Sequence, residues 1–146
     1  MTEYKPSLEY IAGFVDGEGT ITIRKYRTRN SIRGYSYNLY FAVSNTNPEV
    51  LKAMRDVVGA GCVTRSNKFK NKPHWKECFH WKAHSRKAAI IIEKLLPYLI
   101  IKKPQAQLAL KFQQKMIQGH HHLTEEEWAF RDKCYREMRK LNGKGR

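Results

Sequence analysis

The sequence predicts an α+β fold in which a four-stranded antiparallel sheet is covered by helices on one face. The prediction rests on the order of the periodic segments, because a helix followed by two alternating strands occurs twice. Hairpins flanked by helices are typical of an α+β sheet, and 146 residues suffice for one well-packed domain. We therefore expect one domain over 1–146, with an αββαββα core at about 7–118 and extra C-terminal helices at about 119–146.

The first αββ unit is marked by a capped helix and an alternating hairpin. Ser7 is a favoured N-cap residue, and Gly17 and Gly19 stop the helix that begins after it. Two segments then alternate between apolar and polar residues, as half-buried strands do. The predicted elements are a helix over 8–15, a strand over 20–24, a basic loop over 27–34 and a strand over 38–44.

The second unit repeats this order. Asn47 and Pro48 are a cap followed by a proline that fits the first helical turn, and Gly59 ends that helix. Ser85 is expected to cap the helix after the second hairpin. The predicted elements are a helix over 48–58, strands over 62–68 and 75–84 around a basic loop at 68–73, and a helix over 86–96.

Two further helices are expected at the C-terminal end of the chain. Pro97 and Pro104 bracket a short link, after which residues 105–118 read as a helix. Thr124 with Glu127 forms the pattern of a capping box and opens the last helix.

The charge of the chain indicates an anionic partner. There are 28 Lys and Arg against 13 Asp and Glu, a net charge of +15. Between Glu18 and Glu49 there is no carboxylate at all, so the positive field belongs to the first two thirds of the chain and above all to the first hairpin. On charge alone, DNA, RNA and other partners such as an anionic membrane remain equal alternatives.

With helices on the apolar face of the sheet, the polar face is left bare and can enter the major groove of a duplex. An ordinary solvated sheet face is the alternative. The residues expected on the DNA side of the strands are Thr22, Arg24, Tyr26, Asn38, Tyr40, Ser44, His80 and Lys82. The residues expected to track the phosphates are Arg29, Arg33, Lys68, Lys70 and Lys72.

The first helix breaks two local rules. Asp16 and Glu18 lie at its C-terminal end, where the helix dipole disfavours negative charge, although a bound cation would reverse that sign. Ala12 and Gly13 lie inside it, although Gly weakens a helix by about 1 kcal/mol relative to Ala. Close approach of a second helix would explain the small residues. A plain Asp-Gly turn with a glycine C-cap is the other interpretation.

Residues 11–19, Ile-Ala-Gly-Phe-Val-Asp-Gly-Glu-Gly, resemble the nine-residue motif of the LAGLIDADG homing endonuclease family. The resemblance covers about 7–118 and implies a sequence-specific, double-strand DNA endonuclease that works as a homodimer on a long, partly palindromic target. It also implies hydrolysis with staggered 3′ ends, Mg²⁺ as the cofactor with Mn²⁺ as a substitute, and an intron-encoded enzyme. Oxygen ligands favour Mg²⁺ over zinc.

The resemblance also implies roles for single residues. Glu18, at the second acidic position of the motif, would bind the metal together with Gly17. Asn45 would position the attacking water, and Lys102 would lie near the scissile phosphate. The residues implied at the dimer interface are Ala12, Gly13 and Asp16.

A non-catalytic nucleic-acid binder on the same fold, either an RNA maturase or a DNA-binding regulator, is the alternative function. Three cysteines without a paired spacing fit a reducing intracellular setting, in the cytoplasm or an organelle interior. There is no apolar run of about 20 residues and no signal pattern at the N-terminus, so we expect a soluble protein that does not enter a membrane.

Overall fold

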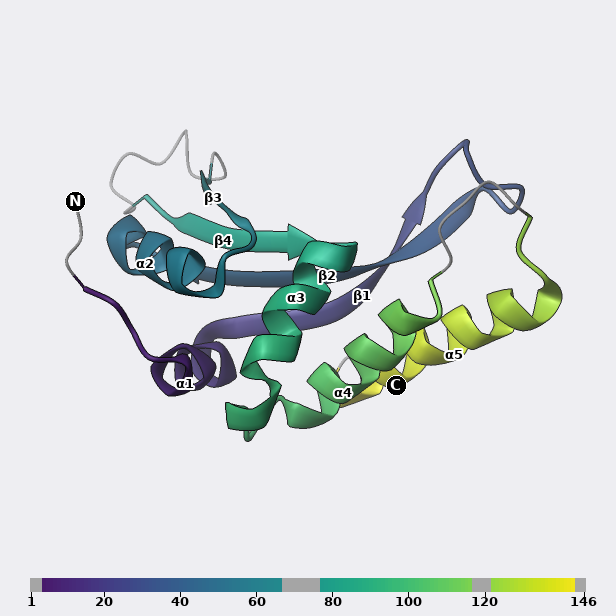
Figure 1. Cartoon of the computed structure of the whole chain (residues 1–146). Coiled ribbons are helices and arrows are strands. Elements are labelled where there is room, and N and C mark those ends of the chain that lie inside the picture. The colour runs from purple at the N-terminus through teal and green to yellow at the C-terminus, as the bar shows by residue number, and fades with distance from the viewer. Residues whose placement is uncertain (1–3, 67–76, 117–121, 144–146) are drawn as a thin grey trace.

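The structure is a computed structural model that describes residues 4–66, 77–116 and 122–143. Its helices and strands are labelled in Figure 1. In chain order, the elements are α1 (Leu8–Glu18), β1 (Gly19–Arg27), β2 (Tyr35–Asn45), α2 (Pro48–Val58), β3 (Cys62–Arg65), β4 (Phe79–His84), α3 (Ser85–Leu95), the 3-10 turn η1 (Leu96–Tyr98), α4 (Lys103–Gln114) and α5 (Glu125–Leu141).

The strands form one antiparallel sheet in the order β1-β2-β4-β3. The helices lie on one side of this sheet and leave its other face uncovered (Figure 1). Both observations confirm the predicted α+β class and the αββαββα order. Among the described residues, no helix combines the length and apolar character that a bilayer crossing requires.

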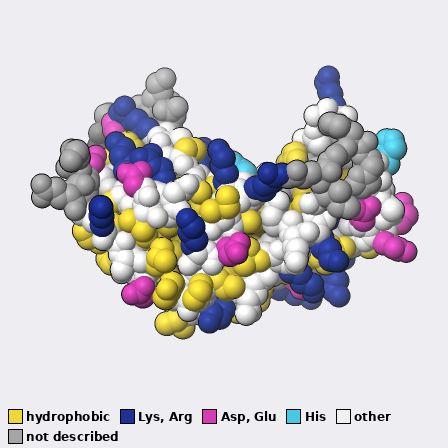
Figure 2. Space-filling model, viewed as in Figure 1, with side chains coloured by type: hydrophobic (Ala, Val, Ile, Leu, Met, Phe, Trp, Pro, Cys, Tyr) yellow, Lys and Arg dark blue, Asp and Glu magenta, His cyan; other side chains and the backbone are white. Residues whose placement is uncertain are grey.

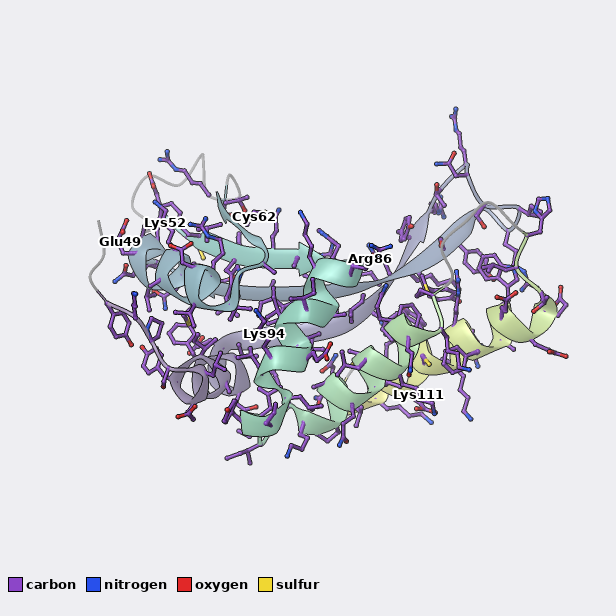
Figure 3. All side chains as sticks on the ribbon, in the orientation of Figure 1. Glu49, Lys52, Cys62, Arg86, Lys94 and Lys111 are labelled. Atoms are coloured by element: carbon purple, nitrogen blue, oxygen red, sulfur yellow. The ribbon has the colours of Figure 1, made fainter. Side chains whose placement is uncertain are left out.

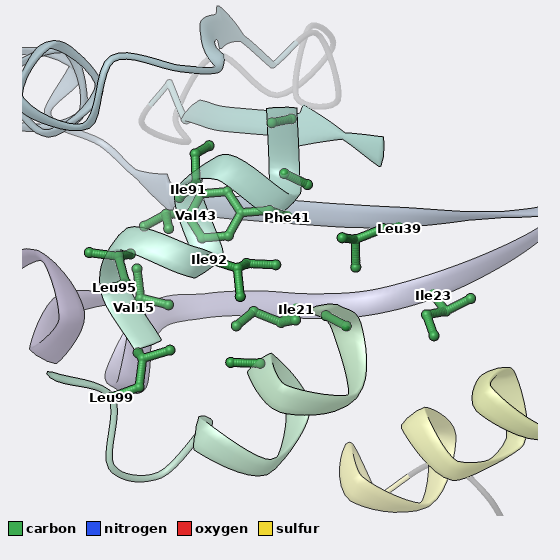
Figure 4. Packing of buried hydrophobic residues seen from close by; sticks show 14 of the residues in the cluster. Val15, Ile21, Ile23, Leu39, Phe41, Val43, Ile91, Ile92, Leu95 and Leu99 are labelled. Atoms are coloured by element: carbon green, nitrogen blue, oxygen red, sulfur yellow. The ribbon is translucent and has the colours of Figure 1, made fainter. Parts of the chain in front are cut away.

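The core lies between the sheet and the helices because the strands alternate as predicted. Ile21, Phe41 and Trp81 point to the helical side and are almost fully buried. They pack with α3, whose Ile91 and Ile92 are also buried (Figure 4). Their burial results from a period of two along each strand, which sends every second side chain to the same face.

The first hairpin is longer than the sequence predicted, because α5 covers the outer part of its apolar face. The Tyr37 hydroxyl donates a hydrogen bond of 3.0 Å to the Asp132 carboxylate, and Tyr35 packs edge-on against Trp128. Burial and the bond to Asp132 raise the pKa of the Tyr37 phenol. Trp128 and Met138 belong to the same core cluster as the sheet. The C-terminal helix is therefore part of the core that shapes the hairpin.

Helix boundaries differ from the predictions at several places. Helix α1 runs through Gly17 to Glu18, past the predicted end at 15, because Gly19 and not Gly17 ends it. Ser85 does not cap α3: it is the first helical residue, with φ of 51°, and no side-chain cap bond forms at His84 before it. The reason is that β4 runs directly into α3, so Ser85 makes the sharp turn itself. Helix α4 ends at Gln114, before the predicted 118, where Lys115 and Met116 donate to carbonyls three residues back and tighten the last turn.

Helix α2 begins and ends as predicted. The Asn47 side chain accepts hydrogen bonds from the main chain of Glu49 and Val50, and Gly59 closes the helix with φ of 84°. Lys94 reaches from α3 and donates to the carbonyl of Val58 at 2.6 Å (Figure 3). A cation at this end of the helix also offsets its dipole.

Gly61 connects α2 to β3 in a conformation that only glycine adopts easily, with φ of 91°. A Cβ atom there would lie 2.6 Å from Nε1 of Trp81, which donates to the carbonyl of Ala60. We predict that Gly61→Ala lowers the free energy of unfolding by about 2 kcal/mol or more, because backbone strain and overpacking add. Urea denaturation followed by tryptophan fluorescence measures this.

Gly59→Ala is the matched control, since it has a similar φ but its added Cβ meets only Nζ of Lys94, at 3.9 Å. It should lower stability by the strain alone, about 1 to 2 kcal/mol. An equal loss in both variants would show that contact with Trp81 plays no part.

Candidate functional site

Helix α1 turns into β1 without a loop, at Glu18 and Gly19. The Gly19 amide donates to the carbonyl of Val15, and a Cβ atom on Gly19 would lie 2.8 Å from that oxygen. Only glycine therefore fits this corner. The corner leaves the Glu18 side chain exposed at the point where the helix meets the sheet.

Asp16 is bound within the chain. Its carboxylate accepts hydrogen bonds of 2.9 Å from the main-chain amides of Ile100 and Lys102. The ammonium group of Lys102 donates at 2.8 Å to the carbonyl of Asp16 itself. These three bonds join the end of α1 to the start of α4, and they bring Lys102 to the corner that carries Glu18.

Asn45 lies at the end of β2, beside the same corner. The ladder pairs Gly19 with Val43, so the last two residues of β2 extend alongside the end of α1. The Asn45 amide oxygen accepts a hydrogen bond of 2.8 Å from the main chain of Asn47. This bond orients the side chain and leaves its NH₂ group as a donor.

The donor set at the corner fits a hard divalent cation. Glu18 offers an exposed carboxylate, whereas the carboxylate of Asp16 is occupied by two amides. In the described residues, no group of three His, Cys, Asp or Glu side chains could hold a metal ion. Mg²⁺ suits such a place, because it keeps several waters and binds proteins through one or two carboxylates plus substrate phosphates.

The uncovered sheet face carries the predicted strand residues. The ladder aligns them in rows across the strands, for example Thr22 with Tyr40, and Ser44 with His80, whose Oγ and Nδ1 lie 2.5 Å apart. In Figure 2 the upper outline of the molecule dips in the middle, and Lys and Arg side chains lie along its margin. The residues that the register places on this face are Thr22, Arg24, Tyr26, Asn38, Tyr40, Ser44, His80 and Lys82.

The residues predicted to track the phosphates have different surroundings. Arg29 is exposed in the hairpin loop. Arg33 is bound to Glu125 at 2.7 Å and lies over the ring of Trp128, so it helps to dock the hairpin on α5. The basic residues of the second loop lie outside the described residues: they are Lys68, Lys70 and Lys72.

Helix α1 has an open side made of small and aromatic residues. Apart from the helix's own backbone and the neighbouring residues, no atom of the described chain lies within 4 Å of a Cβ placed on Gly13 or Gly17. Tyr10 on the same side is 45% exposed. Ala12, in contrast, is fully buried in the core of its own chain. The side chain of Ala12 thus does not reach the open side, and Gly13 does.

Helix α5 adds residues to the sheet face that sequence reasoning missed. Tyr135, Arg139 and Asn142 line a hollow of about 480 Å³ together with Arg24 and Tyr40. The Asn142 amide donates to the carbonyl of Ile21 at 3.1 Å and so covers the edge of β1. The sequence holds no local signal for this contact, which joins residues 121 positions apart.

Solved structures share this fold. Over 92% of the chain, it matches the archaeal intron-encoded homing endonuclease I-Vdi141I complexed with DNA, with a TM-score of 0.77, 21% identity and 82% of that chain covered. I-CvuI, in complex with its target in the presence of calcium, matches over 93% of this chain and 94% of its own, with a TM-score of 0.66 and 20% identity.

A third similar structure is the I-SmaMI homing endonuclease bound to cleaved DNA, with a TM-score of 0.77 and 17% identity. The match covers 97% of this chain but 46% of that one. The chain thus corresponds to about half of the I-SmaMI chain. No curated protein sequence matches it.

The sequence also matches a family model. The model describes the LAGLIDADG endonucleases and matches residues 11–114, which contain the acidic end of α1, the whole sheet and Lys102. The chain therefore belongs to the LAGLIDADG endonuclease family.

Proposed function

We propose that this chain is a sequence-specific, magnesium-dependent DNA endonuclease that acts as a homodimer. The proposal rests above all on a difference between the two acids at the end of α1. The Asp16 carboxylate accepts two main-chain hydrogen bonds, while Glu18 stays exposed at the corner beside the polar sheet face. An acid at the C-terminal end of a helix is locally unfavourable, and proteins keep such unfavourable residues mainly at functional sites.

Double-stranded DNA is the substrate that fits the sheet. The bare face has polar side chains in regular rows and a basic margin, the arrangement that positions phosphates and reads base edges in the major groove. Two of the similar structures are described as complexes with DNA or with cleaved DNA. In the same proposal, cleavage leaves staggered 3′ ends and serves an intron that encodes the protein.

Each residue at the corner has its own role in the proposed hydrolysis. Glu18, with the main chain of Gly17, would hold Mg²⁺, which when bound polarises the phosphate and activates water. The Lys102 ammonium has two protons beyond the one donated to the Asp16 carbonyl. These would stabilise the negative charge that develops on the phosphate. Asn45 would orient the attacking water through its NH₂ group.

A second copy is needed because a duplex has two strands and each chain has one acid-ended helix. A twofold dimer through the open side of α1 would place the two Glu18 corners next to each other. The I-SmaMI chain, of which this chain spans 46%, is consistent with two such folds in one working unit. The target would then be partly palindromic.

For Glu18→Gln we predict a loss of cleavage by about 100-fold or more in Mg²⁺, because the charge that holds the cation is removed. DNA affinity should stay equal or rise slightly, since a carboxylate near a polyanion is lost. Cleavage of a selected duplex and its dissociation constant in EDTA measure the two effects. Asp16→Asn is the control, with lower stability expected as its main effect.

Wild-type protein that leaves every duplex intact in both Mg²⁺ and Mn²⁺ would refute the nuclease. Tight binding of intron RNA in that case would identify a maturase, and tight binding of DNA a regulator.

Lys102→Met should slow cleavage by about 10²- to 10³-fold, because a positive group beside the developing phosphate charge is lost. The bond to Asp16 is lost as well, so the free energy of unfolding should fall by about 1 to 2 kcal/mol. Single-turnover cleavage well below the melting temperature separates the two effects. Lys103→Met, one residue along the chain, is the matched control, and an equal slowing there would remove the special role of Lys102.

Gly13→Leu should dissociate the dimer and leave the fold intact. A Cβ atom at this position meets no atom within 4 Å from the other described parts of the chain, so the added side chain has space in the single chain, yet it would hold two α1 helices apart. Sedimentation equilibrium should show a monomer with the wild-type circular dichroism spectrum, and cleavage should be lost. Gly13→Ala, a much smaller change, should remain largely dimeric. A Gly13→Leu dimer as tight as the wild type would place the interface elsewhere.

A further inference from the structure

Three side chains form a stack on the uncovered sheet face. The guanidinium carbon of Arg24 lies 3.4 Å from the centre of the Tyr40 ring. The ring of Tyr40 lies 5.0 Å from the ring of His84, with an angle of 45° between their planes. The ladder places Tyr40 directly opposite His84 and two residues along β2 from the partner of Arg24, so the stack results from strand register.

The Arg24 guanidinium lies over the Tyr40 ring. Within the described part of the chain, this group makes no hydrogen bond and no ion pair, although it is exposed. Asn38 lies directly opposite on β2, and its buried amide oxygen also has no partner there. The N–H groups of Arg24 are therefore held in place without a hydrogen-bond acceptor. In this state an arginine can bind a planar acceptor through two N–H groups of its guanidinium at once.

The stack also borders the hollow beside α5. Its volume is about 480 Å³, and its rim is polar and basic. Partial desolvation, and then the positive charges of Arg24 and Lys82, lower the pKa of the His84 imidazole. The other residues that line the hollow include Thr20, Thr22, Tyr26, Tyr135, Arg139 and Asn142.

We infer that Arg24 is a specificity-determining residue that reads one guanine in each half of the target, and that Tyr40 is its positioning residue. This inference rests on the proposed function as a DNA-binding homodimer. Guanine presents O6 and N7 side by side in the major groove, and the arginine fork matches both acceptors. Arg24 lies among polar groups on the sheet face, away from the hairpin loop. We therefore expect its guanidinium to contact the edge of a base and not a phosphate.

The test is selection of bound duplexes from a randomised library in EDTA, so that metal-dependent cleavage plays no part. Full-length wild type should enrich a guanine at one position in each half-site, and replacing that base pair should weaken binding by about 5- to 150-fold. Arg24→Gln should lose this preference and keep the others. Tyr40→Leu should weaken it at the same position, whereas Tyr40→Phe, which keeps the ring, should preserve it.

Three results would overturn the inference, and they are distinguishable. If Arg24→Gln weakens all sequences equally and lowers the salt slope by about 0.9, Arg24 binds a phosphate and the DNA-binding proposal still stands. If Tyr40→Leu keeps the full guanine preference while Arg24→Gln loses it, Tyr40 has no positioning role. If the wild type enriches no sequence, the inference and the proposed function fail together. Melting curves for each variant ensure that folded proteins are compared.

Discussion

The hydrogen bonds accepted by the Asp16 carboxylate are the interaction on which the rest of the site depends. An acid at the C-terminal end of a helix opposes the helix dipole, and two main-chain amides together with the Lys102 ammonium offset that cost here. The same bonds fix the start of α4 against α1. As a result, the remaining acid, Glu18, stays exposed at the corner to which Lys102 is also bound. Asp16 and Glu18 have different roles because residues two positions apart on a helix point in different directions. Asp16 joins two helices, and Glu18 is left for the proposed chemistry.

The second constraint is the one-sided covering of the sheet. Helices bury the apolar side, and α5 extends this cover along the first hairpin through Trp128 and Tyr37. Because side chains alternate along a strand, a fully packed inner face leaves an outer face of polar groups at regular spacing. The ladder then brings residues of different strands into contact, as in the stack of Arg24 on Tyr40. A surface suited to reading a duplex is thus a consequence of how the core is closed.

The open side of α1 completes this arrangement. In the described chain, no atom from another element lies within 4 Å of the Cβ positions of Gly13 and Gly17, whereas Ala12 on the other side is buried. Glycine weakens a helix by about 1 kcal/mol relative to alanine, so its use where the single chain has space needs a reason outside that chain. In the proposed dimer the reason is close helix contact, which would join two corners and two sheet faces into one surface. The helix that holds the acids would then also set the distance between them.

The sequence by itself determined the order of elements, the buried faces of the strands, the capped ends of α2 and the family motif, because periodicity, caps and glycine positions are local signals. It also predicted which strand residues share the polar face. Only the tertiary structure decided the length of the first hairpin, the internal use of Asp16, the docking of Arg33 on Glu125 and the burial of Ala12. Each of these depends on a partner far away in the chain, as Tyr37 depends on Asp132, and such a contact leaves no periodic trace near either residue.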